Sequence, residues 1–113
     1  MLQNRNQLIE LFIGNITNAI VHRILEKAIK KEEIADKYRK ELITSFEVAK
    51  KYREKINPVT SSLPDKDVLY IEEKIIKRVK AELNLRIERG YENIDLDAVE
   101  QEIDKSLREA KIM

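Results

Sequence analysis

Helix-breaking residues are almost absent from this chain, and their scarcity limits the folds that are open to it. The 113 residues include only 2 Gly and 2 Pro, and both prolines, Pro58 and Pro64, fall in one short segment. Proline disrupts a helix interior, whereas most other residues of the chain are good helix formers. The sequence therefore predicts an all-α fold, a small bundle of three to four helices.

The spacing of the apolar residues places these helices within one domain that spans residues 1–113. The predicted helices cover about residues 3–29, 31–56, 63–89 and 96–111, with a Pro-containing connection at 57–64. The second helix repeats its apolar residues at steps of three and four, as in a coiled coil. No Ser, Thr, Asp, Asn, Gly or Pro lies between His22 and Ala35, so nothing marks a helix end there. The first two helices are therefore either one continuous long helix or two helices joined by a tight, uncapped corner.

Helix ends are marked elsewhere by a few residues. Gly90 is expected to end the third helix, because glycine adopts the left-handed conformation that follows a helix. Ser62 with Asp65, and Asp97 with Glu100, have the spacing of capping boxes. These pairs predict the starts of the third and fourth helices.

The first helix contains the most apolar stretch of the chain. Between positions 8 and 21 the apolar residues cover more than half of the helix circumference and leave a narrow polar seam. Such a helix is central in a core or shared between two chains, and we expect a homodimer formed through it, with Gly14 allowing close approach. The predicted interface consists of Leu8, Phe12, Ile13, Asn15, Ile16, Asn18, Ile20 and His22. The alternative is a four-helix monomer in which the C-terminal helix covers the first helix.

The polar seam itself, formed by Asn15, Asn18 and His22, has two interpretations. It lines a polar ligand site between helices, or its amides fix the register of packed helices as a polar residue does in a coiled-coil core. We favour the second interpretation.

Composition argues against most catalytic chemistry. The chain has 0 Cys and 1 His, which excludes thiolate metal sites and di-iron sites with two Glu-x-x-His pairs. Oxygen ligands remain, and Glu32, Glu33 and Asp36 are spaced as in an all-α, magnesium-dependent nucleotide hydrolase. Among 21 acidic residues such spacings arise by chance. We expect no catalytic residue, metal or cofactor, and the hydrolase is the least favoured hypothesis.

Basic residues on the second and third helices raise a different possibility, a nucleic-acid-associated accessory protein. The candidate phosphate-binding residues are Lys50, Lys51, Arg53, Lys74, Lys77 and Arg78. Glutamates interrupt both clusters, and the net charge of the whole chain is only +1. A solvated helix face is therefore the favoured interpretation, and nucleic-acid binding is the second hypothesis for function.

Charge is distributed unevenly along the chain. Residues 91–113 carry seven acidic and three basic side chains, a net −4, which leaves +5 on the first 90 residues. This asymmetry favours docking of the C-terminal end onto the rest of the chain or onto another copy.

The favoured hypothesis for function is a non-enzymatic helical module that acts through protein–protein contacts, with itself or with another protein. The sequence shows neither a secretory signal nor an uninterrupted run of 18 apolar residues. We therefore expect a cytoplasmic protein with no membrane partner. The Lys-, Glu- and Ile-rich composition resembles that of thermophile proteins.

Overall fold

The computed structural model describes residues 4–57 and 62–112, and every regular element in them is helical. The elements are α1 (Arg5–Ala28), α2 (Glu32–Ile56), α3 (Asp65–Glu88), the short 3₁₀ helix η1 (Leu96–Ala98) and α4 (Val99–Glu109). The predicted all-α bundle is thus confirmed, with helix bounds within a few residues of those expected. Residues 58–61 of the predicted connection lie outside the described residues.

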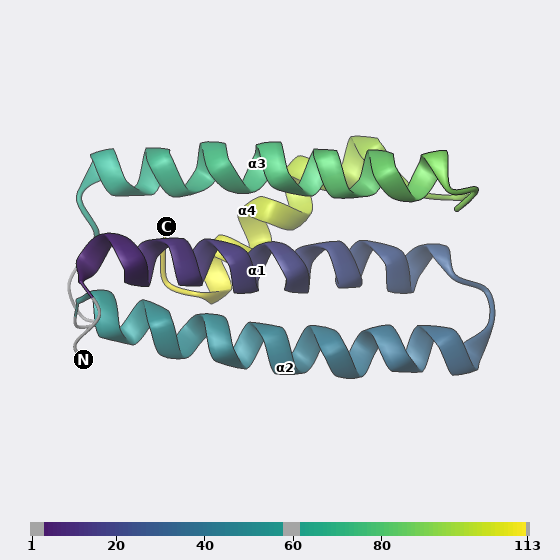
Figure 1. Ribbon diagram of the computed structural model, residues 1–113, viewed down its shortest axis with the longest axis horizontal. Coiled ribbons are helices and arrows are strands. Elements are labelled where there is room, and N and C mark those ends of the chain that lie inside the picture. Colours follow the sequence, from purple (N-terminus) through teal and green to yellow (C-terminus); the bar gives the residue numbers. More distant parts are fainter. Residues whose placement is uncertain (1–3, 58–61, 113) are drawn as a thin grey trace.

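The chain turns sharply between α1 and α2, and the two helices are not continuous. Ile29 and Lys31 both have extended backbone conformations, and no side chain of the corner caps α2. α2 then runs back along α1 in the opposite direction (Figure 1). A single straight helix would have left the apolar surface of α1 in water, whereas the corner buries it against α2.

Helix ends differ from the predicted caps at three places. α3 begins at Asp65 directly after Pro64 without a side-chain cap, so the expected Ser62 capping box does not form. Ahead of η1 it is the Asp95 carboxylate that accepts a hydrogen bond from the Asp97 backbone, and α4 has no side-chain cap. A capping box that the sequence analysis missed, between Asn4 and Gln7, begins α1. Gly90 does follow α3 with a φ of 98°, as predicted.

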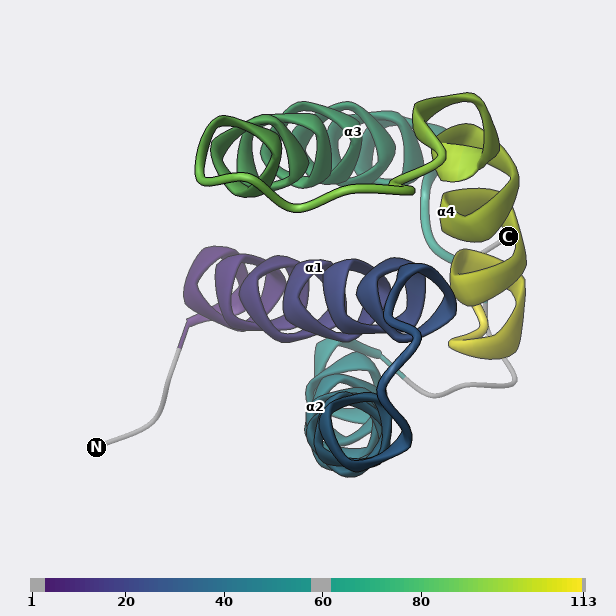
Figure 2. The same cartoon turned by 90° about the vertical axis from the view of Figure 1, so that its right-hand side faces the viewer.

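α1 is the central element of the bundle. α2 and α3 lie along opposite sides of α1, and α4 lies across it on a third side (Figure 2). The three long helices therefore form one layer, and the short α4 is the only helix of a second layer within the described residues. The core gathers along this central axis, with the side chains of Phe12, Ile16 and Ile20 fully buried.

α4 supplies the cover that α2 and α3 leave open on one side of α1. Its apolar residues Val99, Ile103 and Leu107 are buried in the common core. Among the described residues, α1 is the one helix that is long and apolar enough to cross a membrane, but 67% of its most apolar 18-residue window is buried within the protein. α1 thus has the surroundings of the core helix of a soluble protein.

Candidate binding face on α1

The side of α1 opposite α4 carries no helix in the described part of the chain (Figure 2). Gly14 and Asn18 are exposed there, and Leu11 and Asn15 are half-buried beside them. These four residues recur at helical spacing, and we call the surface they form the open face of α1. A Cβ atom placed on Gly14 would have no other atom within 4 Å. The open face therefore leaves room for another group to approach the α1 backbone closely.

The surface is hollowed on both sides of Asn18. One hollow of about 290 Å³ lies between α1 and α3, and its α3 wall includes Arg78, Glu82 and Arg86. A second hollow, of about 280 Å³, lies between α1 and α2 and is lined in part by Glu41. These volumes are close to the lower end of the range for small-molecule sites and also accommodate single side chains of a partner.

Most residues predicted for the dimer interface are covered by the chain itself. The side chains of Leu8, Phe12, Ile13, Ile16, Ile20 and His22 are buried among α1, α2, α3 and α4. The C-terminal helix supplies the missing cover, which is the alternative arrangement considered for the sequence. Only Asn15 and Asn18 of the predicted interface remain accessible, and both belong to the open face.

The amides of the polar seam make short-range contacts. Asn15 donates from Nδ2 to the backbone oxygen of Leu11, one turn earlier in α1, at 2.8 Å. Asn18 donates from Nδ2 to the Ser45 hydroxyl on α2, also at 2.8 Å. Asn18 therefore helps to fix α2 against α1, while its side chain stays exposed on the open face.

His22 is buried between α1 and α2 at one end of the open face. Its Nε2 atom lies 2.9 Å from a carboxylate oxygen of Glu41, and its ring packs on Tyr38 with the ring centroids 5.4 Å apart. Burial lowers the pKa of His22, although the nearby Glu41 carboxylate opposes this shift. The imidazole is therefore mainly neutral at neutral pH and packs between α1 and α2.

Two tyrosines and an arginine join the helices beside His22. The hydroxyl oxygens of Tyr38, on α2, and Tyr91, just after α3, lie 3.1 Å apart. Arg86 of α3 places Nη1 3.5 Å from each hydroxyl and its guanidinium over the Tyr91 ring. Within residues 4–57 and 62–112 this arginine makes no ion pair with a carboxylate. Within the same residues Arg86 thus contacts two hydroxyl groups and an aromatic ring.

Most of the predicted phosphate-binding residues have contacts of their own. Lys50 pairs with Glu47 and lies over the Phe46 ring. Arg53 is 1% exposed and donates from Nε to the backbone oxygen of Lys111 at 2.8 Å, and burial lowers its pKa. On the other side of α1, the Lys74 ammonium lies over the ring of Tyr70, and Arg78 pairs with Glu10. The α2 and α3 clusters are separated by α1, so the fold does not bring the candidates Lys50, Lys51, Arg53, Lys74, Lys77 and Arg78 to one surface.

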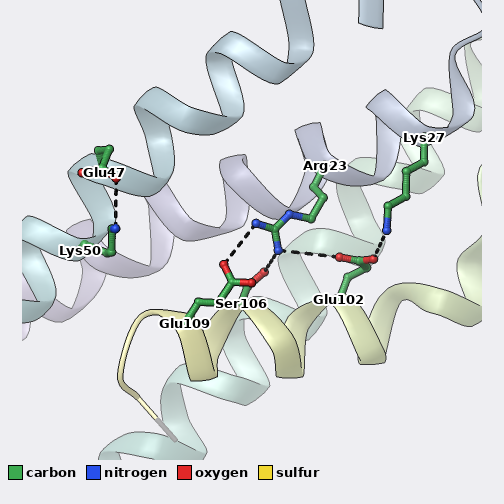
Figure 3. Close-up of polar contacts among 7 residues, drawn as sticks. All are labelled: Arg23, Lys27, Glu47, Lys50, Glu102, Ser106 and Glu109. Carbon is green, nitrogen blue, oxygen red and sulfur yellow. Dashed lines mark hydrogen bonds and ion pairs between the residues drawn. The ribbon is translucent and has the colours of Figure 1, made fainter. Parts of the chain in front are cut away.

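The acidic C-terminal end docks on the basic side of α1. Arg23 donates to the Ser106 hydroxyl at 3.2 Å and lies 3.4 Å from a Glu109 carboxylate oxygen (Figure 3). The Glu102 carboxylate of α4 is largely buried between Arg23 and Lys27, which both belong to α1. The acidic C-terminal end thus pairs with basic residues of α1 in the same chain, and these contacts orient α4.

No three His, Asp or Glu side chains within 4–57 and 62–112 are grouped so as to hold a metal ion. In the acidic cluster that the sequence analysis considered, Asp36 pairs with Arg39 and Lys40 of the following turn.

Searches of protein-family models, of curated proteins and of solved structures found no match to this chain. Its function has to be inferred from its own geometry.

Proposed function

We propose that this chain is a helical interaction module that acts by binding protein rather than by catalysis, and that its partner is a second copy of itself. The copy would dock over the open face of α1. The observation that carries the proposal is the free space above Gly14, where a Cβ atom would meet nothing within 4 Å. Glycine on a helix surface allows another backbone to approach at close range.

The shape of the surface supports this docking mode. The hollows on the two sides of Asn18 lie between neighbouring helices, so each offers space in which a side chain of a docked helix can pack. The second copy would add a three-helix layer on the open face, which is the side of α1 that α4 does not cover. In a two-fold interface the same patch of both copies meets itself. An amide such as Asn18 suits this position because it carries both donors and an acceptor.

The buried state of His22 supports a non-enzymatic role. This single histidine contacts Glu41 and Tyr38 between two helices, so its contacts are those of a structural residue. We also infer a cytoplasmic location, since the core is built from apolar burial without any cysteine in the sequence.

Light scattering over a range of concentrations tests the self-association. The expected mass rises from 13.3 kDa towards twice that value as the concentration increases. Gly14→Lys should abolish the increase, because the new side chain fits the free chain but fills the space that the partner needs. Gln101→Lys is the matched control, since it adds the same charge to an exposed position of α4, away from the open face.

Two results would contradict the proposal. One is a mass of 13.3 kDa at every concentration up to the solubility limit. The other is a dimer that Gly14→Lys and Gln101→Lys leave equally intact, which would place the interface elsewhere.

A further inference from the structure

One residue on the wall of the hollow between α1 and α3 carries a buried polar group without a partner. Thr17 lines the hollow and is 7% exposed, and its hydroxyl oxygen has no hydrogen-bond partner among the described residues. A buried hydroxyl without a partner is costly and calls for a specific explanation.

Arg86 stands at the same hollow with its charge unpaired by any carboxylate of the described chain. A guanidinium presents a planar fork of donors that matches the oxygens of a carboxylate or a phosphate. Tyr38 and Tyr91 hold this side chain in place through contacts of 3.5 Å. Arg86 is thus a positioned cation that retains donors for a ligand.

Two more charged residues stand at the hollow on successive turns of α3. Arg78, two turns before Arg86, adds a second positive charge, although part of it is used by Glu10 at 3.2 Å. Glu82 lies between the two arginines in the sequence and makes no ion pair within the described residues. Its carboxylate can accept a hydrogen bond from a ligand but repels an anion that lacks a donor.

The geometry points to a binding site for a small organic anion in this hollow. The ligand carries a carboxylate or phosphate group that Arg86 binds, and a neighbouring hydroxyl or amino group that donates to Glu82. The hollow of about 290 Å³ suits a metabolite-sized molecule rather than a polymer. This inference goes beyond the proposed self-association and does not depend on it. Because the hollow lies beside Gly14, the ligand and a second copy compete for the same surface, and the ligand binds the single chain.

Titrations followed by NMR test the site with two simple probes, inorganic phosphate and malate, a dicarboxylate with a hydroxyl group that can donate to Glu82. The backbone amide signals of Gly14 and Asn18, which line the hollow, are recorded at pH 7 while sodium chloride keeps the ionic strength constant. We expect a saturable shift with at least one probe. Saturation by phosphate alone identifies a phosphate ligand, and saturation by malate alone identifies a carboxylate ligand. The absence of saturation with both probes would overturn the inference.

Matched variants separate binding in the hollow from general charge effects. Arg86→Gln should raise the Kd at least tenfold, whereas Arg89→Gln, which removes the same charge from an exposed position just after α3, should leave it unchanged. Glu82→Gln should lower the Kd for phosphate, because it removes a like charge. Equal Kd values for Arg86→Gln and Arg89→Gln would overturn the site.

Thr17 gives a second, independent readout. Thr17→Val should leave the Kd unchanged, because the buried hydroxyl does not reach a ligand in the hollow, and the valine variant should be at least as stable as the original because no existing hydrogen bond is lost. Light scattering on the same samples reports self-association separately, so failure of one proposal can be told apart from failure of the other.

Discussion

Gly14 and Gly90 provide a matched pair of substitutions with opposite expected signs. Gly14 lies in the middle of α1 with free space around its missing side chain, so Gly14→Ala should stabilise the free chain by about 0.5–1 kcal/mol. Gly90 has a φ of 98°, so Gly90→Ala should destabilise it by about 1–2 kcal/mol. Urea unfolding at low protein concentration measures both. Destabilisation by Gly14→Ala would show that the space above this residue is filled in solution.

His22 makes the pH dependence of stability simple to interpret near neutrality, because it is the only histidine. Burial lowers its pKa in the folded chain, so the unfolded chain binds the proton more readily. The free energy of unfolding should therefore decrease as the pH falls below about 6.5, by at most about 1.4 kcal/mol per pH unit. His22→Gln should remove this slope between pH 7.5 and 5.5. A stability that increases over the same interval would show that the contact with Glu41 outweighs burial.

The role of a single residue could be predicted from the sequence where the backbone conformation alone determines the residue type. Gly90 follows α3 as expected, because the left-handed conformation favours glycine whatever surrounds it. The capping box expected at Ser62 failed, since α3 begins directly after Pro64. Thr17 and Arg86 were missed altogether. Their significance depends on α1 and α3 lying side by side, and the sequence contains no local sign of that contact.

The docking of α4 on α1 can be tested by comparing two arginines that differ mainly in burial. Arg23 has a side chain 17% exposed and contacts the nearly buried Glu102, whereas Arg39 is 45% exposed and pairs with Glu26. Arg23→Ala should cost about 1–3 kcal/mol of unfolding free energy, because it leaves Glu102 with Lys27 alone. Arg39→Ala should have little effect on the free energy of unfolding, because its ion pairs lie in water. Equal costs would mean that the contacts of Arg23 do not hold α4.

Helices were predictable as elements because their apolar periodicity and the scarcity of breakers agree along most of the chain. The corner between α1 and α2 was not decided by the sequence. Ile29 and Lys31 leave the helical conformation without a capping side chain, so it is the packing of α2 on α1 that ends the first helix. Packing between elements is a tertiary effect, and local sequence around these residues does not record it.

The dimensions of the whole molecule give a further test. The Cα radius of gyration is 14.4 Å and the longest extent is 40 Å. A compact chain of this length is expected to have a radius of gyration of about 13 Å, so the molecule is slightly elongated. X-ray scattering extrapolated to zero concentration should give a radius close to the 14.4 Å of the Cα atoms. A much larger value under these conditions would show that α2 or α3 does not stay packed on α1.

The arrangement of helices around α1 was only partly predictable at the scale of the molecule. The apolar surface around most of α1 indicated a central position, which the fold confirms. The same pattern was compatible with cover from a second chain or from the C-terminal helix. The two alternatives bury the same residues, such as Phe12 and Ile16, so periodicity alone could not distinguish them.

The central position of α1 has a consequence for the order of events during synthesis. α2, α3 and α4 all follow α1 in the chain, so the ribosome releases the most apolar helix before any helix that covers it. At about 5–20 residues per second, the wait until residue 112 is on the order of 10 s. Throughout that interval a helix apolar enough to enter a bilayer is without its final cover. The nascent chain therefore depends on α2 folding back early, or on a chaperone that shields α1 until α4 has been made.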